Sequence, residues 1–587
     1  MKASDFISRY LEARGVTHVF ELVGGMITHL LDSISLSTHI EIVSCHHEQA
    51  AGFAAEGHAR VTGVPGVALA TSGPGATNLL TAVGSCFFDS SPTVFITGQV
   101  NTYELKGARS IRQLGFQETD IVAIVQSICK SAVQVKSAAE LPAVLEAAFK
   151  LALGGRQGPC LVDIPMNVQS EVIDDAVAKR WLETAKNTQF ADTDDSHLLS
   201  DEKDPKKSLI ALLSAVNQAE RPMLLLGGGC AASSNRDAAL RIAERLGIPA
   251  VLSLMAVDVL PESHPQRVGF IGSYGNRWAN KALGIADLLV VIGSRLDIRQ
   301  TGSDLESFCD GKQIWQIDID SAEIGARIKP HHSICCSINS AADNLEELAN
   351  FSGLHHQVWF AEIDALRIQF PALLEYFAEP DEINPIHLLK KISSNVLEQC
   401  YYVTDVGQHQ MWAAQSLQFK KCDRFLTSGG MGAMGFGLPA AIGAAFANRN
   451  AITILVSGDG SFQVNIQELE TVKRNRLNLK IILFNNHCHG MVRQFQETYF
   501  KGNLQSTVQG YSTPDFVEIC HAYGINARRL ESVVEVDECL NWLLQSEEPT
   551  FLEVPLSIHS RVYPKLAFGR KFGEMEPEAS PIAMEST

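Results

Sequence analysis

Short runs of apolar and β-branched residues alternate along this chain with longer segments of mixed polarity. Runs of this length are typical of buried strands, and the segments between them are long enough for helices. The clearest predicted strands are 40–43, 67–70, 93–97, 160–164, 222–226, 287–292, 314–319, 451–457 and 479–484. Because strands that alternate with helices assemble into parallel doubly wound sheets, the pattern predicts an α/β fold.

Three alternating segments are separated by two stretches that are poorer in apolar runs. At about 150 residues per domain, a chain of 587 residues has room for three or four domains. The stretch 184–207 is rich in Asp, Ser, Lys and Thr, a composition typical of a linker. We therefore expect α/β domains at 1–172, 208–350 and 384–560, linkers at 173–207 and 351–383, and a proline-containing tail at 561–587.

The composition is that of an ordinary globular protein, with 46% hydrophobic and 19% charged residues. The formal net charge of −18 argues against binding to nucleic acid or to anionic membrane surfaces. No apolar run approaches the roughly 20 residues that cross a bilayer, and the N-terminal segment carries no secretory pattern. The 13 cysteines are scattered without a metal-binding spacing, so we expect reduced thiols in a cytoplasmic protein.

A candidate metal site is marked by two short polar motifs that follow predicted strands. Gly458-Asp459-Gly460 comes directly after the strand 451–457, and Asn486 comes just after the strand 479–484. Carboxylate and amide oxygens are hard ligands that suit Mg²⁺, which proteins usually share with phosphate groups. In open parallel sheets such strand ends form the ligand-binding edge, and a helix expected at 462–474 would favour a diphosphate there. Taken singly, Asp-Gly and Asn-Asn are common turn sequences.

A second candidate is Glu48, which follows the predicted strand 40–43 and precedes a run of small apolar residues at 50–55. Polar residues at strand ends are often only surface groups. Here the apolar run predicts a buried helix, which would leave Glu48 partly desolvated. Burial disfavours the charged form of a carboxyl group and thereby suits it to proton transfer.

Three motifs together resemble those of thiamine diphosphate (ThDP) enzymes of the acetolactate synthase group. They are His47-Glu48-Gln49, the sequence Thr-Ser-Gly-Pro-Gly-Ala-Thr-Asn at 71–78, and the glycine-rich sequence at 427–441. The resemblance extends over nearly the whole chain. It implies a pyrimidine-binding domain, a central Rossmann-like domain and a diphosphate-binding domain, with ThDP and Mg²⁺ as cofactors.

The resemblance also assigns roles to individual residues. Glu48 would hydrogen-bond the aminopyrimidine ring of ThDP, and Phe116 and Gln117 would face the active site as further catalytic residues. The metal ligands would be Asp459, Asn486 and the main-chain oxygen of Cys488. The cofactor would be held by Gly24, Gly25, Gly73, Pro74, Asn78, Gln408, His409, Gly432, Met434, Gly458, Gly460, Ser461, His489, Gly490 and Met491.

Within that set, Gln408 and His409 would contact the diphosphate, and Met434 would support the bent form of the cofactor. The residues assigned to the substrate are Met26, Met166, Arg299, Val406 and Phe495. The planar guanidinium group of Arg299 suits a substrate carboxylate, although Arg299 could equally be a solvated surface charge. At Met26, Met166 and Phe495 the chain departs from the family pattern, so the cofactor half is intact and the acceptor half is altered.

These features predict a carboligase that decarboxylates pyruvate and transfers the resulting two-carbon unit to a carbonyl acceptor. The acceptor would be pyruvate, as in acetolactate synthase, or a nucleotide-linked ketosugar. A simple 2-oxo acid decarboxylase, which transfers the unit to no acceptor, is a further alternative.

Two further expectations follow from the resemblance. The segments 227–229, 295–299 and 317–320 are similar to a central domain that binds FAD without redox chemistry, although a glycine run alone is a weak signal. Glu48 and Asp459 lie in different predicted domains yet would touch one cofactor. Active sites are therefore expected at the subunit interface of a homodimer or homotetramer.

Overall fold

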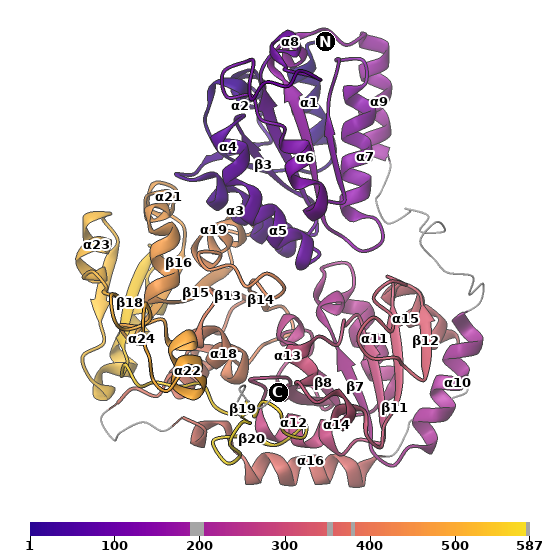
Figure 1. The fold of residues 1–587 in the computed structure, drawn as a ribbon, viewed down its shortest axis with the longest axis vertical. Helices are drawn as coiled ribbons and strands as arrows, with labels where there is room; N and C mark the ends of the chain where they lie inside the picture. Colours follow the sequence, from indigo (N-terminus) through magenta and orange to yellow (C-terminus); the bar gives the residue numbers. More distant parts are fainter. Residues whose placement is uncertain (188–204, 349–355, 377–381, 583–587) are drawn as a thin grey trace. The chain divides into compact units, whose positions relative to one another are not determined.

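The computed structural model describes residues 1–187, 205–348, 356–376 and 382–582 (Figure 1). Within these residues it contains three six-stranded sheets flanked by helices and one small two-stranded sheet. The predicted α/β class with three parallel-sheet domains is confirmed. The chain divides into two compact units: one holds the first sheet with residues 428–453 and 463–479, and the other holds most of the remaining chain.

The first sheet has the strand order β2-β1-β3-β4-β6-β5. Its strands are β1 (His18–Leu22), β2 (Glu41–Ser44), β3 (Gly66–Ala70), β4 (Thr93–Gln99), β5 (Ser131–Gln134) and β6 (Pro159–Pro165). The helices of this segment are α1 (Ala3–Ala13), α2 (Thr28–Ser35), α3 (Glu48–Thr62), α4 (Pro74–Asn78), α5 (Leu80–Phe88), α6 (Ile121–Val125), α7 (Leu141–Leu153), α8 (Met166–Ser170) and α9 (Asp175–Asn187). Every residue of β3, β4 and β6 is buried, which is why these strands are mainly apolar in sequence.

The second sheet has the order β12-β11-β10-β7-β8-β9. Its strands are β7 (Pro222–Leu226), β8 (Ala250–Leu252), β9 (Arg267–Phe270), β10 (Leu288–Ile292), β11 (Gln313–Asp318) and β12 (His332–Cys335). Its helices are α10 (Pro205–Gln218), α11 (Arg236–Leu246), α12 (Arg277–Gly284), α13 (Ile298–Thr301), α14 (Leu305–Cys309), α15 (Ile338–Glu347) and α16 (Gln357–Gln369). Alternate residues of β10 join two separate hydrophobic clusters, one with α10, α11 and α15 and the other with α12 and α16, so both faces of the sheet are covered.

The third sheet has the order β14-β13-β15-β16-β18-β17. Its strands are β13 (Cys400–Thr404), β14 (Arg424–Leu426), β15 (Ile452–Gly458), β16 (Leu479–Asn485), β17 (Asn526–Arg529) and β18 (Thr550–Pro555). The helices of this segment are α17 (Pro385–Asn395), α18 (Gln408–Ser416), α19 (Gly437–Ala447), α20 (Asp459–Phe462), α21 (Leu469–Arg474), α22 (Gly490–Tyr499), α23 (Phe516–Ala522) and α24 (Val536–Gln545).

The helix expected at 462–474 is not continuous, and that expectation is wrong. Asn465 leaves the helical conformation with φ −129° and ψ 31°, between the short helix α20 and the helix α21. Its side-chain amide donates to the main-chain oxygen of Gly435 at 2.7 Å and to Oε1 of Gln49 at 3.0 Å. These partners are distant in sequence, so local hydrophobic periodicity does not register the break.

Within the first unit, α3 and α19 pack with their backbones in close approach. A Cβ placed on Gly57 would lie 2.2 Å from the main-chain oxygen of Ala440, and one on Gly443 would lie 1.9 Å from that of Ala54. Backbone atoms on both sides leave no flexible side chain to move aside. The two glycines therefore set the distance between the helices.

Replacing Gly57 with alanine should destabilise the first unit by roughly 1–3 kcal/mol, the usual cost of overpacking a core. Thermal or urea unfolding measures the change. Thr62→Ala, on an exposed part of the same helix, removes atoms instead of adding them and serves as the control. A Gly57→Ala protein as stable as the wild type would contradict the close backbone contact between α3 and α19.

Parts of both predicted linkers are helical. Helix α9 lies within 173–207, and its Ala178 and Ala185 join the core of the first sheet. Helix α16 lies within 351–383 and contributes Trp359 and Ile363 to the second. Residues 188–204, 349–355, 377–381 and 583–587, which fall in predicted linkers, their borders and the tail, are outside the described residues, and the domain boundaries stay a prediction. In the described part of the chain, no helix has both the length and the apolarity of a membrane span.

The C-terminal tail is docked on the helices of the second sheet. Its hairpin pairs β19 (Lys565–Leu566) with β20 (Met575–Glu576). The buried Arg277 of α12 forms two bonds to the carboxylate of Glu375, at 2.6 and 2.8 Å, and donates to the main-chain oxygen of Glu576 at 3.0 Å. The Leu566 N–H donates to the main-chain oxygen of Ser273 at 2.8 Å. The buried guanidinium group of Arg277 thus holds the tail against the helices that cover the second sheet.

Candidate functional site

The predicted metal ligands lie at the ends of two neighbouring strands of the third sheet. Asp459 follows β15, and Asn486 follows β16. Both side chains are buried, with 3% and 6% of their surface exposed. The backbone N–H of Cys488 hydrogen-bonds the carboxylate of Asp459, so all three predicted ligand residues belong to one cluster.

The electrostatics of this cluster fit a bound cation. Burial raises the pKa of the Asp459 carboxyl to about 7, although hydrogen bonds from Gly460, Tyr511 and Cys488 act in the opposite direction. The charged carboxylate is therefore short of stabilisation in the protein alone, and a divalent cation would supply it. One carboxylate, one amide oxygen and one carbonyl oxygen are hard ligands that leave room for phosphate oxygens and water around Mg²⁺.

His409 lies against the glycine turn that precedes Asp459. A Cβ on Gly458 would come within 2.7 Å of Nδ1 of His409, so the turn requires glycine there. Burial lowers the pKa of His409 to about 3, which keeps the ring neutral. Its buried Nε2 makes no hydrogen bond with any described residue. Since buried polar atoms are normally paired, this atom fits a partner such as a phosphate oxygen.

A second close approach involves His489. A Cβ on Gly460 would lie 2.6 Å from Cε1 of His489, whose ring centroid is 4.4 Å from that of Tyr511. The hydroxyl of Ser461 donates to the main-chain oxygen of Gly458 at 3.3 Å and closes the turn. Gly490 and Met491 begin α22 beside this cluster.

Gln408 has partners that the sequence did not suggest. Its Nε2 donates to the main-chain oxygen of Ser560 at 2.9 Å, and its Oε1 accepts from Nδ2 of Asn486 at 2.9 Å. The amide is thus engaged inside the protein at both ends. Contact between Gln408 and a diphosphate stays a prediction.

The candidate catalytic carboxyl group belongs to the first unit. Glu48 is the first residue of α3 and only 6% exposed, in agreement with the predicted burial. Its Oε2 accepts from Nδ2 of Asn78 at 2.9 Å, and a Cβ on Gly75 would lie 3.1 Å from its Oε1. Asn78, which was expected to contact the cofactor, therefore also orients Glu48.

Gly73 and Gln117 are brought together in the same unit. A Cβ on Gly73 would lie 3.0 Å from both Cβ and the main-chain oxygen of Gln117. Gln117 has φ 66°, a left-handed conformation that is costly for a residue with a side chain and is enriched at functional sites. The neighbouring Phe116 is 78% exposed, and Glu118 closes the loop by accepting two backbone N–H groups.

Two of the residues that depart from the family pattern lie on connected segments. The N–H of Met26 donates to Oγ1 of Thr71 at 3.3 Å, and its main-chain oxygen accepts from Nε2 of Gln169 at 2.8 Å. Met166 begins the short helix α8 that contains Gln169. A Cβ on Gly24 would lie 2.4 Å from that of Thr71, so this glycine is required by packing.

The loop that carries Met434 is anchored by a carboxylate of the first unit. Asp89 accepts from the N–H groups of Gly429 and Gly430 at 3.0 and 2.6 Å. Met434 itself is 38% exposed, which suits contact with a ligand better than filling a core gap. The remaining predicted residues of this unit lie in turns or at helix starts: Gly25, Pro74 and Gly432.

The other predicted substrate residues lie in the second unit. Phe495 of α22 is 40% exposed and packs against Tyr499 and Phe500, with ring centroids 4.8 and 5.8 Å apart. Arg299 in α13 is exposed, as both a carboxylate receptor and a solvated charge would be. The N–H of Val406 donates to the carboxylate of Asp405 at 2.8 Å. The substrate set is therefore divided between the two units.

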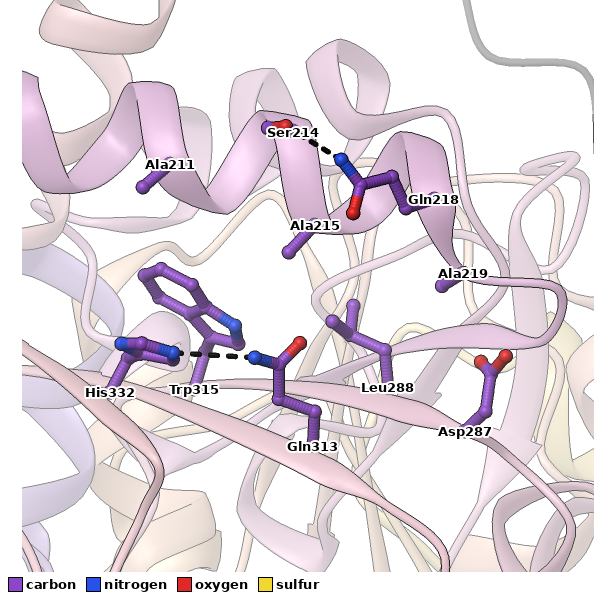
Figure 2. A pocket seen from close by; sticks show the side chains of 10 residues that line it. All are labelled: Ala211, Ser214, Ala215, Gln218, Ala219, Asp287, Leu288, Gln313, Trp315 and His332. Atoms are coloured by element: carbon purple, nitrogen blue, oxygen red, sulfur yellow. Dashed lines mark hydrogen bonds between the residues drawn. The ribbon is translucent and has the colours of Figure 1, made fainter.

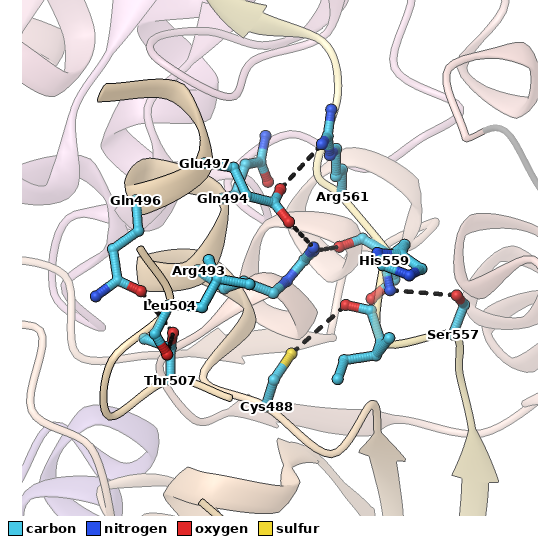
Figure 3. Close-up of polar contacts among 12 residues, drawn as sticks. Cys488, Arg493, Gln494, Gln496, Glu497, Leu504, Thr507, Ser557, His559 and Arg561 are labelled. Carbon is cyan, nitrogen blue, oxygen red and sulfur yellow. Dashed lines mark hydrogen bonds and ion pairs between the residues drawn. The ribbon is translucent and has the colours of Figure 1, made fainter. Parts of the chain in front are cut away.

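Sequence reasoning missed a polar cluster that surrounds Arg493. This side chain is 1% exposed, pairs with Glu497 at 2.7 Å and donates to the main-chain oxygen of Ser560 (Figure 3). Cys488 contacts the same segment through its thiol, 3.7 Å from the main-chain oxygen of Ile558. The one sign of this cluster in the sequence is that Arg493 and Glu497 are spaced at i and i+4 on α22, a spacing that ordinarily marks a surface ion pair.

A cavity of about 430 Å³ lies elsewhere, between α10 and the starts of β10, β11 and β12. Figure 2 shows Ala211 and Ala215 of α10 facing Trp315 and His332, whose rings stack with centroids 4.0 Å apart. None of the predicted site residues lines it. Ligands of open parallel sheets bind at the opposite, carboxyl ends of strands, so we do not place the active site here.

Comparison with protein families finds three matches along the chain. Residues 1–124 match the thiamine pyrophosphate enzyme N-terminal TPP binding domain, residues 209–345 the thiamine pyrophosphate enzyme central domain, and residues 405–554 the thiamine pyrophosphate enzyme C-terminal TPP binding domain. The matches follow the order of the three sheets. Thiamine pyrophosphate is the same molecule as ThDP.

Individual relatives are similar over nearly the full chain. The chloroplastic acetolactate synthase of Arabidopsis thaliana is 36% identical over 98% of this chain and 84% of its own length. The large subunit of acetolactate synthase isozyme 1 from Escherichia coli K12 is 36% identical over 98% of this chain and 97% of its own length. The chain therefore belongs to the thiamine pyrophosphate enzymes of the acetolactate synthase family.

Proposed function

We propose that this protein is a ThDP-dependent carboligase that decarboxylates pyruvate and transfers the two-carbon unit to a carbonyl acceptor. The observation that carries the proposal is the full-length identity of 36% to acetolactate synthases. The buried cluster of Asp459, Asn486 and His409 supports it, because these residues supply cation ligands and an unpaired polar atom at a strand-end edge.

When bound, the cofactor would supply a nucleophilic thiazolium carbon and an electron sink for the decarboxylation of a 2-oxo acid. The chain's own residues would bind and orient it. Asp459, Asn486 and the main-chain oxygen of Cys488 would hold Mg²⁺, and His409 would donate to a phosphate. Glu48, oriented by Asn78, would hydrogen-bond the pyrimidine ring and exchange a proton with it.

For the acceptor we propose a second pyruvate, which makes acetolactate the product. The acetolactate synthase relatives favour this choice over a nucleotide-linked ketosugar and over simple decarboxylation. Arg299 would receive the carboxylate of a 2-oxo acid. This chain has Met166 where the family pattern has a lysine and Phe495 where it has a tryptophan, so we expect these two residues to shape the acceptor pocket.

The purified protein supplied with ThDP, Mg²⁺ and pyruvate alone should form acetolactate. Product is measured by its acid conversion to acetoin, with acetaldehyde assayed in parallel. Acetaldehyde as the main product would favour simple decarboxylation. If turnover appears only when a nucleotide-linked ketosugar is added, the ketosugar and not pyruvate is the acceptor.

A second cofactor, FAD, is proposed for the central sheet. Residues 295–299 come shortly after β10, and residues 317–320 include the end of β11. These two strands are adjacent and parallel, and the carboxyl ends of such strands form a binding edge. The glycine run does not contribute to this argument. A Cβ on Gly227 would lie 2.1 Å from the main-chain oxygen of Gly293, so packing already requires that residue. A flavin absorbance spectrum of the purified protein tests the proposal.

We further propose a cytoplasmic homodimer or homotetramer with active sites at the subunit interface. Glu48 and Met434 belong to one compact unit and Asp459 and Asn486 to the other. The family resemblance assigns all four residues to the same cofactor. Light scattering coupled to gel filtration gives the mass. A mixture of Glu48→Gln and Asp459→Asn proteins, each inactive alone, should regain activity on subunit exchange if the sites are shared between chains.

A further inference from the structure

The orientation of the Asn486 amide is fixed by two hydrogen bonds. Its Nδ2 donates to Oε1 of Gln408 at 2.9 Å and to Oγ of Ser560 at 3.0 Å. Both hydrogens of the amide nitrogen are therefore used. The rotated amide would place its oxygen, which has no hydrogen to donate, against Oε1 of Gln408, which is itself only an acceptor. The oxygen Oδ1 is thus held as the free end of the side chain, and it is the atom that a hard cation needs.

Ser560 can orient the Asn486 amide because several hydrogen bonds hold Ser560 and its neighbours in place. Its main-chain oxygen accepts from Nε2 of Gln408 at 2.9 Å and from Nη2 of Arg493. Val562 lies two residues after Ser560, and its backbone N–H and C=O both hydrogen-bond the side-chain amide of Gln494, at 3.0 and 3.1 Å. Ser560, Gln408, Arg493 and Gln494 are each no more than 5% exposed, so water does not compete for these bonds.

The position of Gly490 shows how closely the network is packed. A Cβ there would lie 2.1 Å from Oε1 of Gln408 and 2.7 Å from Nδ2 of Asn486. Any side chain at this position would displace the two amides from each other. Glycine at the start of α22 therefore makes room for the bond that aims Asn486.

We propose that Ser560 is a positioning residue for the metal ligand Asn486, acting together with Gln408. The inference rests on the proposed function and deepens it, because it assigns a metal-site role to the segment after β18. In this arrangement Gln408 helps to aim a metal ligand through its Oε1. The same segment is clamped by Arg493 and Gln494 of α22, so the helix that carries Met491 and Phe495 is tied to the metal site.

The test compares Mg²⁺ and Ca²⁺ affinity of full-length variants at saturating ThDP, measured by isothermal titration calorimetry. Ser560→Ala should weaken Mg²⁺ binding by about 10-fold, at the lower end of the effect of outer-shell partners. Ca²⁺ binding should weaken less, because Ca²⁺ tolerates irregular geometry whereas Mg²⁺ demands near-ideal octahedral ligands. The melting temperature of the metal-free variant should stay close to that of the wild type.

Ser557→Ala is the matched control, since Ser557 lies in the same segment and its Oγ accepts from the N–H of His559, at 3.2 Å, which is not one of the residues around Asn486. Ser560→Thr retains the hydroxyl and should recover most of the Mg²⁺ affinity. Equal loss of Mg²⁺ and Ca²⁺ affinity, an equal loss in Ser557→Ala, or wild-type affinity in Ser560→Ala would overturn the inference. A wild-type protein that binds no Mg²⁺ with ThDP would instead overturn the proposed function.

Discussion

Glu48→Gln should lower the rate of pyruvate consumption by at least about 100-fold, within the range that a positioned general acid or base contributes. Glutamine has the same shape and can still accept from Asn78, but it cannot give up or take a proton. Binding of ThDP should change little, because the diphosphate and metal contacts belong to other residues. The measurements are the steady-state rate and the dissociation constant of ThDP.

Glu41→Gln is the control for this experiment. It removes a carboxylate from the same domain, at a position that is about half exposed and contacts Arg449 across 3.4 Å. Its activity should equal that of the wild type. A Glu48→Gln enzyme with undiminished turnover would show that the carboxyl group has no part in activating the cofactor.

Asp459→Asn should weaken Mg²⁺ binding by more than about 100-fold, since changes to outer-shell partners alone cost 10–100-fold. The substitution keeps the shape of the side chain but removes the single negative charge from a set of neutral oxygen ligands. ThDP should be retained poorly as well, because its diphosphate would lose the bridging cation. Gel filtration followed by assay of bound ThDP and metal measures both losses.

The fold of this variant should persist. Burial raises the pKa of Asp459 to about 7, so the charged carboxylate costs stability in the metal-free protein above that pH. The metal-free Asp459→Asn protein should therefore melt no lower than the metal-free wild type at pH 8. Lower melting would mean that the loss of metal comes from a damaged fold, and the assignment of Asp459 as a ligand would then lose its support.

Nine of the eighteen strands in the three large sheets were predicted, because buried parallel strands are mostly apolar, whereas short polar strands such as β5 and β17 were not. β7 matches the predicted run 222–226, and β15 and β16 differ from their predictions by one residue. The burial of Glu48 was equally predictable from the small residues that follow it. The break at Asn465 was not, because its partners Gly435 and Gln49 are remote in sequence.

The candidate site divides in the same way. Asp459 and Asn486 carry a local signal, since each follows a strand directly and glycines mark the turn. Ser560 carries none, because it sits in a polar stretch after β18 and acquires its role from contacts with Gln408 and Asn486, 152 and 74 positions away. Residues that aim a ligand are recognised by their partners, and sequence position alone does not reveal them.

The docked tail connects the metal site at the third sheet with the second sheet, so metal binding should affect the thermal stability of the second sheet. Residues 556–562 pass Asn486, and the hairpin that follows is fastened to α12 by Arg277. A ligand that binds only the folded state stabilises that state in proportion to its occupancy. Filling of the metal site should therefore raise the unfolding temperature of the second sheet, although that sheet contributes no metal ligand. We therefore expect the segment 556–576 to couple the thermal unfolding of the second and third sheets.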